Sequence, residues 1–173
     1  AGICTESIVD LVVRNGPDEI NYLIELGAQF DKQDSSGDYQ LGREGGHSAR
    51  RILHARDATG AEIQRAIFEK ASKHENIEIL PHHIAIDFIK NEADEILGTY
   101  ALDKNTGEIK TFVARTCMLA TGGVGKVYLY SSNPDVSTGD GIAMAYRAGA
   151  EVSNMEFIQF HPTCLFHPKA KSC

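Results

Sequence analysis

The chain has 173 residues, of which 42% are hydrophobic and 24% charged, as is usual for one globular domain. Its net charge of −7 disfavours non-specific nucleic-acid binding, and no apolar run approaches the ~18 residues of a membrane-spanning helix. The four cysteines are scattered without a CxxC pair and no signal peptide is visible, so we expect no zinc site, reduced buried thiols and a cytoplasmic protein.

The first part of the chain is predicted to be helical. Residues 5–13 form a partly amphipathic pattern that Asn15-Gly16-Pro17 interrupts. A second helix is expected to begin at Pro17 and to stop at Gly27, which suits a left-handed C-terminal position. Residues 30–42 are polar and contain glycine, which predicts a loop.

A third helix is predicted at Thr59-Gly60-Ala61-Glu62, which has the spacing of a capping box. Strand-like patterns then follow over residues 77–80, 83–90, 95–103, 108–113, 115–120 and 152–160. Lys104-Asn105-Thr106-Gly107 predicts a hairpin turn, and residues 139–148 predict a short helix that ends at Gly149. The local pattern is therefore α+β.

Two motifs with glycine could expose backbone groups to a ligand. Thr121-Gly122-Gly123 follows an apolar segment, where glycines let a backbone approach a ligand, and a plain turn is the alternative. Thr138-Gly139-Asp140-Gly141 precedes the short helix. From the residues alone, Asp140 would be an N-cap worth about 1 kcal/mol.

Glu44 lies in the motif Arg43-Glu44-Gly45-Gly46-His47-Ser48, whose glycines would let a substrate approach. A fixed carboxylate favours a cationic group and disfavours a second carboxylate, because like charges repel. An exposed loop glutamate is the alternative. The basic residues that follow would form either a local positive patch or the solvated start of a helix: Arg50, Arg51, His54 and Arg56.

His161 lies in Phe160-His161-Pro162-Thr163, where the proline restricts the backbone and the imidazole can donate to a carboxylate. The Thr163 hydroxyl would support it, and a structural or exposed histidine is the alternative. The adjacent His82 and His83 would point to opposite faces of a strand, so they would not share a metal. The sequence has no G-x-S-x-G, no P-loop and no G-x-G-x-x-G, the motif that normally holds a dinucleotide pyrophosphate.

Three stretches taken together resemble one flavoprotein family: Arg43–Arg51 (REGGHSARR), Ala120–Gly125 (ATGGVG) and Asn154–Pro168 (NMEFIQFHPTCLFHP). The family contains the L-aspartate oxidases, succinate dehydrogenases and fumarate reductases, and the resemblance is strongest to the L-aspartate oxidases. It implies an α/β fold, the central part of a Rossmann-like FAD-binding domain with an inserted small antiparallel sheet.

The resemblance also implies a domain division. Residues 1–152 would be a partial FAD-binding domain without its N-terminal GxGxxG unit, and residues 153–173 would begin the capping domain that closes over the substrate. We therefore expect an internal fragment that is inactive alone and binds FAD weakly.

The resemblance assigns roles to individual residues. FAD would be held non-covalently, with Ile84 and Ala85 on its adenine side and with Asp140 and Thr121-Gly122-Gly123 also in contact. The substrate would be L-aspartate. Glu44 would orient its α-ammonium group, and His161, supported by Thr163, would bind a carboxylate; Glu44 and His161 are the expected catalytic residues.

The implied reaction is oxidation of L-aspartate to iminoaspartate, in which a hydride leaves Cα for the flavin and oxygen or fumarate takes the electrons. In this family the product feeds quinolinate and NAD synthesis, which implies coupling to quinolinate synthase.

Two alternatives stay open. The chain could belong to the flavoprotein subunit of a succinate dehydrogenase or fumarate reductase, although those enzymes lack an acid at the place of Glu44. It could also be a non-catalytic folded domain, which the missing G-x-G-x-x-G motif favours.

Overall fold

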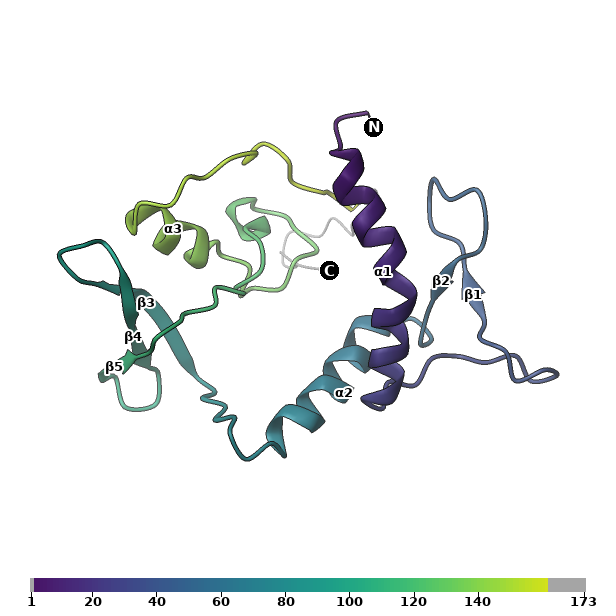
Figure 1. Cartoon of the computed structure of the whole chain (residues 1–173), viewed down its shortest axis with the longest axis horizontal. Helices are drawn as coiled ribbons and strands as arrows, with labels where there is room; N and C mark the ends of the chain where they lie inside the picture. Colours follow the sequence, from purple (N-terminus) through teal and green to yellow (C-terminus); the bar gives the residue numbers. More distant parts are fainter. Residues whose placement is uncertain (1, 162–173) are drawn as a thin grey trace. The chain divides into compact units, whose positions relative to one another are not determined.

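The computed structural model describes residues 2–161, which form two compact units that divide between Ile79 and Leu80 (Figure 1). The first contains two helices, α1 (Glu6–Glu25) and α2 (Thr59–Ser72), and two short strands, β1 (Leu41–Gly42) and β2 (Ile52–Leu53). The second contains three strands, β3 (His83–Lys90), β4 (Ile96–Asp103) and β5 (Ile109–Val113), the 3-10 helix η1 (Gly125–Val127) and helix α3 (Asp140–Arg147). Both sheets are antiparallel. The predicted mixture of helices with small antiparallel sheets is confirmed.

Helix α1 is a single helix, Glu6–Glu25, so the predicted break at Asn15-Gly16-Pro17 is wrong. Pro17 lies inside the helix, where it removes one N–H donor from the backbone ladder. The Asn15 side chain adds a hydrogen bond by donating from Nδ2 to the Leu11 carbonyl at 2.7 Å. The predicted end is confirmed, since Gly27 has a φ of 101°.

The segment between the two helices carries a small hairpin that the sequence pattern did not predict. β1 (Leu41–Gly42) pairs with β2 (Ile52–Leu53), and Lys32 and Tyr39 form an isolated bridge before them. The predicted loop over residues 30–42 is therefore correct except at these positions.

Helix α2 spans Thr59–Ser72 and begins where the capping-box pattern predicts, but the predicted cap does not form. The Thr59 hydroxyl instead accepts a hydrogen bond from the Ala55 N–H at 3.1 Å, which closes the preceding turn. The Glu62 carboxylate does not cap the helix either, because it accepts hydrogen bonds from Gln29 and Arg65.

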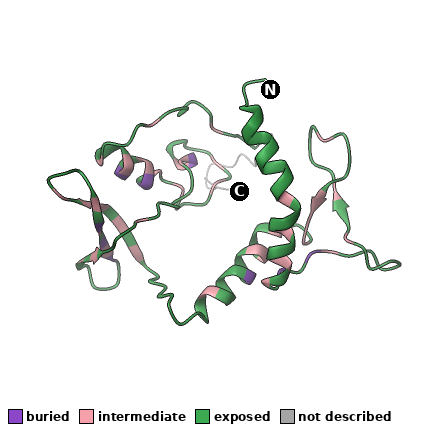
Figure 2. Cartoon of the chain, in the orientation of Figure 1, coloured by how far each residue is buried: buried purple, intermediate pink, exposed green. Residues whose placement is uncertain are grey.

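The core of the first unit is small. Ala28, Phe30 and Ala66 are its buried residues, and partly buried side chains surround them: Ile20, Leu23, Ile24, Tyr39, Leu53 and Ile63 (Figure 2). The first turns of α1 lie outside this core and expose their apolar side chains, Ile8, Val9, Leu11, Val12 and Val13. Only the C-terminal turns of α1 therefore gain stability from packing within this unit.

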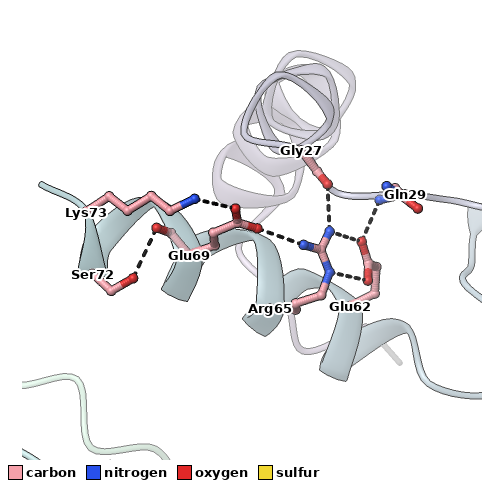
Figure 3. A network of polar contacts seen from close by, with 7 residues as sticks. All are labelled: Gly27, Gln29, Glu62, Arg65, Glu69, Ser72 and Lys73. Carbon is pink, nitrogen blue, oxygen red and sulfur yellow. Dashed lines mark hydrogen bonds and ion pairs between the residues drawn. The ribbon is translucent and has the colours of Figure 1, made fainter.

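Glu62 and Arg65 join α2 to the segment that leaves α1 (Figure 3). Glu62 accepts hydrogen bonds from the Gln29 N–H at 2.7 Å and from Arg65 Nη2 at 2.6 Å. Arg65 Nη2 also donates to the Gly27 carbonyl at 2.8 Å. The hydrogen bonds from Arg65 and Gln29 lower the pKa of Glu62 to about 2. The Glu62 carboxylate thus binds both the Arg65 guanidinium and the Gln29 backbone N–H, just after the end of α1.

In the second unit, β3 (His83–Lys90), β4 (Ile96–Asp103) and β5 (Ile109–Val113) form a meander in that order, and the predicted hairpin is confirmed. Asp103 is buried at the hairpin base, where Lys110 Nζ donates to it at 2.7 Å and the Asn105 N–H at 2.9 Å. These bonds lower the pKa of Asp103 to about 2, so it stays ionised at physiological pH.

Three predicted strands, residues 77–80, 115–120 and 152–160, are wrong, because these segments are irregular. An apolar segment becomes a strand only when a neighbouring strand takes its N–H and C=O groups. Within residues 2–161 no strand pairs with any of the three. The predicted short helix is confirmed as α3 (Asp140–Arg147), and Gly149 follows it with a φ of 99°.

The start of α3 packs against Thr121 and Val124. A Cβ atom on Gly141 would overlap the Thr121 hydroxyl, and one on Gly139 would lie 2.6 Å from a Val124 methyl group. Gly139 also has a φ of 80°, which favours glycine. Because residues 139 and 141 are glycines, the start of α3 can lie in direct contact with Thr121 and Val124, about 20 residues earlier in the sequence.

The bonds of Glu62 generate a pH prediction. Its pKa is about 2 in the folded chain and 4.5 as an ordinary glutamate, so its contribution to stability is complete above pH 4.5 and is lost as pH falls through 2. We expect Glu62→Gln to lower the urea midpoint of the first unit at neutral pH, and to lower it less near pH 2. Far-UV circular dichroism measures both.

The control for Glu62→Gln is Glu75→Gln, which alters an exposed carboxylate just after α2. Equal effects of the two substitutions at neutral pH would show that the Glu62 bonds do not stabilise the fold.

The contact between Thr121 and Gly141 generates a packing prediction. Gly→Ala inside a helix normally stabilises by up to about 1 kcal/mol, but the Thr121 contact should make Gly141→Ala destabilising by about 1–3 kcal/mol. Adding Thr121→Ala should recover part of the loss. Gly60→Ala in α2, where a Cβ meets nothing within 4 Å, is the control and should not destabilise. A stabilising Gly141→Ala in urea unfolding would contradict this packing.

Candidate functional site

The second unit contains a cavity of about 610 Å³ beside the start of α3. Residues 123–125 and Ile142 line it together with the segment 154–161, which includes Phe157, Phe160 and His161. Gly123 faces open space, since nothing lies within 4 Å of the place its Cβ would occupy, and its φ is not positive. Neither packing nor backbone conformation within residues 2–161 thus requires glycine at position 123.

The predicted residue His161 lines the same cavity as Gly123, so the structure brings these two sequence-predicted positions together. The neighbouring Phe160 packs edge-to-face on Tyr128, with ring centroids 5.0 Å apart, which anchors the chain just before the histidine. The predicted residue Thr163 lies outside the described residues.

Asp140 is the first residue of α3, and Gly139 occupies the N-cap position, so the predicted N-cap role of Asp140 is wrong. Its carboxylate accepts a hydrogen bond from the Thr138 hydroxyl at 2.9 Å. A negative charge in the first turn is favourable because it faces the positive end of the helix dipole. Asp140 is thus held at the same helix start that Thr121 contacts.

Ile84 and Ala85 lie on β3 and pair with Leu102 and Ala101 of β4. In the meander β3 is an edge strand, so alternate backbone N–H and C=O groups point away from β4. Backbone groups of β3 that do not bond to β4 are therefore available at this edge.

Glu44 lies in the loop between β1 and β2 in the first unit and is exposed. The loop is closed by the Arg43 guanidinium, which donates to the His47 carbonyl at 2.7 Å, and by the His47 N–H, which donates to the Glu44 carbonyl at 3.2 Å. Residues 43–48 line a hollow of about 560 Å³. The loop thus holds the Glu44 backbone and leaves its side chain at the surface.

His47 is a residue that the sequence reasoning did not single out. Its Nδ1 is buried and has no hydrogen-bond partner among the described residues. Such an atom is uncommon, because a buried polar atom without a partner costs free energy. Nothing in the sequence of this glycine-rich loop predicts that the His47 Nδ1 is buried without a partner.

The basic residues after this loop do not begin a helix, so that alternative is wrong. Arg51 donates to the Ser48 hydroxyl at 2.8 Å, and Arg50 donates to the Leu41 carbonyl at 3.4 Å. His54 Nδ1 lies 3.2 Å from the Asp31 carboxylate. These three side chains therefore contact groups of their own unit, while Arg50 and Arg51 remain exposed.

Asp87 of β3 links its strand to helix α3. Arg147 Nε of α3 donates to its carboxylate at 2.7 Å, and this bond lowers the pKa of Asp87. No spacing rule connects a strand residue with a helix residue 60 positions later, so sequence reasoning could not find the pair.

Among residues 2–161, no group of three or more His, Cys, Asp or Glu side chains could hold a metal ion. No helix in this range is long and apolar enough to cross a membrane. Cys4 and Cys117 are free thiols, and Cys4 is exposed, so the expectation of buried thiols is wrong for Cys4.

The chain is similar in sequence to L-aspartate oxidases from bacteria and plants. L-aspartate oxidases of Vibrio cholerae and Pseudomonas aeruginosa are each 48% identical over 99% of this chain. A chloroplastic L-aspartate oxidase of Nicotiana tabacum is 48% identical over 95% of it. The chain covers 34% of each bacterial relative and 26% of the plant relative, so it spans about a third of the bacterial relatives' length.

Solved structures share the fold. A variant of Escherichia coli quinol fumarate reductase superposes with a TM-score of 0.90 at 29% identity, over 99% of this chain and 28% of that one. Mycobacterium smegmatis Sdh1 in complex with UQ1 gives a TM-score of 0.81 at 34% identity, over 92% of this chain and 28% of that one.

The residues of the second unit fit a flavin nucleotide. The cavity volume is in the usual range of small-molecule sites, roughly 300–1,000 Å³, and Gly123 presents open backbone beside apolar side chains. A family model described as an FAD binding domain matches residues 1–172. The chain therefore belongs to the family of FAD-binding domains, with FAD as its cofactor.

Proposed function

We propose that the chain is part of an FAD-dependent L-aspartate oxidase, which converts L-aspartate to iminoaspartate in the first step of quinolinate and NAD synthesis. The observation that carries the proposal is the identity of 48% with proteins named L-aspartate oxidase over 99% of the chain. The fumarate reductase and Sdh1 chains share the fold at 29% and 34% identity.

FAD, when bound, supplies the acceptor for the hydride that leaves the substrate Cα. In the proposal, the cavity beside Gly123 holds the ring system, and the open glycine backbone lets a flat aromatic group approach closely. Gly123 lines this cavity, and Thr121 and Gly122, which precede it in the chain, are proposed to belong to the same cofactor site. Asp140 at the start of α3 contacts the cofactor, and Ile84 and Ala85 offer backbone groups at the β3 edge to its adenine side.

His161 is proposed to bind a substrate carboxylate, because its side chain belongs to the cavity that Gly123 lines and an imidazole N–H can donate to an oxygen. Thr163 is proposed to support it. Holding the carboxylate fixes the substrate relative to the ring, which reduces the entropy that the reaction must lose.

Glu44 is proposed to bind the α-ammonium group of aspartate. It is exposed on a loop whose backbone is held by Arg43 and His47, so its carboxylate meets a ligand without losing an internal ion pair among the described residues. A carboxylate at this point also disfavours succinate, which has two negative charges and no cation.

Within the complete protein, residues 1–152 would be a partial FAD-binding domain, and residues 153–173 the start of a capping domain. The protein would act in the cytoplasm and be coupled to quinolinate synthase.

A flavoprotein subunit of a succinate dehydrogenase or fumarate reductase is the second candidate, which the TM-score of 0.90 with a fumarate reductase favours. The two candidates differ in the substrate group that position 44 would meet. Only an amino acid offers a cation to the Glu44 carboxylate.

Glu44→Gln in the complete flavoprotein tests this choice. Loss of the negative charge should lower the ratio of kcat/KM for L-aspartate to that for succinate by about tenfold, because about 1.4 kcal/mol of selective binding is lost. Steady-state oxidation of both substrates measures the ratio.

The control for Glu44→Gln is Asp38→Asn, which alters an exposed carboxylate in the preceding loop and should leave the ratio unchanged. An unchanged ratio in Glu44→Gln would remove Glu44 from the substrate site. Turnover of succinate but not aspartate by the unmodified protein would favour the second candidate.

The 173-residue chain alone should bind FAD weakly, because it has no G-x-G-x-x-G turn for the pyrophosphate. We expect the purified chain to be colourless and to show no saturable quenching of flavin fluorescence at micromolar FAD. A yellow chain with one flavin per molecule would contradict this expectation.

A further inference from the structure

Strand β3 contains a bulge next to the proposed adenine-side residues. Ala85 pairs with Ala101 and Asp87 with Tyr100, so Ile86 has no partner on β4. A bulge of this kind frees backbone groups and redirects the side chains that follow it, and bulges are frequent next to active sites. The strand is therefore irregular immediately after Ala85.

Arg147 of α3 binds both groups that the bulge presents. Its Nε donates to the Asp87 carboxylate at 2.7 Å, and its Nη2 donates to the Ile86 carbonyl at 2.9 Å. The flat guanidinium suits this double contact because its donors have a fixed geometry. Lys90 adds a third bond from β3, since its Nζ donates to the Ala148 carbonyl at the end of α3, at 3.2 Å.

The opposite end of α3 contacts the proposed flavin site. Asp140 and Arg147 are seven residues apart, which corresponds to about 10 Å along a helix. At the Asp140 end, Gly141 packs on Thr121 and Gly139 on Val124, and Ile142 lines the cavity. Helix α3 therefore connects the bulge of β3 with the cavity, and Figure 1 shows α3 beside the sheet.

We infer that Asp87 and Arg147 are positioning residues for FAD: they fix α3 on β3 and so set the distance between the adenine-side strand and the flavin-side cavity. The inference rests on the proposed function of this domain. A dinucleotide touches both places at once, so a helix that is free to shift loses one contact when it makes the other.

The pair is partly exposed, with 48% of the Arg147 side chain and 37% of the Asp87 side chain accessible to solvent. Ion pairs of this kind are weaker than buried ones because water and salt screen them. The expected effect of breaking it is therefore modest, a threefold to tenfold weaker affinity for FAD, or about 0.7–1.4 kcal/mol.

The test uses the complete flavoprotein, with Asp87→Asn, Arg147→Ala and the double variant. Asp87→Asn keeps the shape of the side chain and leaves every charge on α3 in place, so it separates positioning from the stability of the helix itself. The FAD dissociation constant of each apoprotein is measured by flavin fluorescence quenching. Visible circular dichroism of the bound flavin reports its surroundings, and far-UV circular dichroism reports helix content.

We expect each single variant to weaken FAD binding threefold to tenfold, and the double variant to be no weaker than Arg147→Ala alone, since both lose the same pair. The flavin band in visible circular dichroism should change while helix content does not. Arg147→Lys should recover part of the affinity, because it keeps the charge but makes one contact. Arg115→Ala, an exposed arginine of the same unit, is the control and should bind FAD as the unmodified protein does.

Unchanged FAD affinity in Asp87→Asn would overturn the inference, even if Arg147→Ala binds weakly, because that result would assign the effect to helix stability. Additive losses in the double variant would also overturn it. An unmodified protein that binds FAD but does not oxidise aspartate would count against the proposed substrate alone and would leave this test valid.

Discussion

The contact between Thr121 and Gly141 is the constraint on which the proposed site depends. A side chain on Gly141 would occupy the place of the Thr121 hydroxyl, so α3 can begin against Thr121-Gly122-Gly123 only when glycine is present. This packing puts Asp140 at the helix start and Ile142 in the wall of the cavity that Gly123 and His161 also line. The absence of a side chain on Gly141 thus brings the segment Thr121-Gly122-Gly123 and the N-terminus of α3 together beside the cavity that His161 lines.

Each unit is also held by a carboxylate that bonds to backbone and to a cation. In the first unit Glu62 accepts from Gln29 and Arg65, and in the second Asp103 accepts from Asn105 and Lys110. Both carboxylates have a pKa of about 2, because these hydrogen bonds favour the ionised form.

Local pattern was sufficient for part of the fold. The β3–β4–β5 meander, α2 and α3 follow from periodicity, a hairpin turn and glycine stops, which act over a few residues. Two strand predictions failed because a strand needs a partner from elsewhere in the chain: residues 115–120 and 152–160 have strand-like composition but no strand partner among residues 2–161. The predicted helix break also failed, since Pro17 lies within a helix that continues past it. The Asp87–Arg147 pair joins residues 60 positions apart, and no local signal marks it. For the site, the motifs identified Gly123 and His161, which line one cavity, whereas the roles of Glu44 and His161 toward a substrate stay predictions.

The most direct test is a crystal structure of the complete flavoprotein with reduced FAD and L-aspartate, from crystals grown without oxygen. The account predicts that the isoalloxazine ring lies against the Gly123 backbone in the cavity beside α3. It also predicts the His161 imidazole within about 3 Å of a substrate carboxylate oxygen, the distance of a hydrogen bond. A flavin ring bound away from Gly123, or a substrate with both carboxylates out of reach of His161, would contradict it.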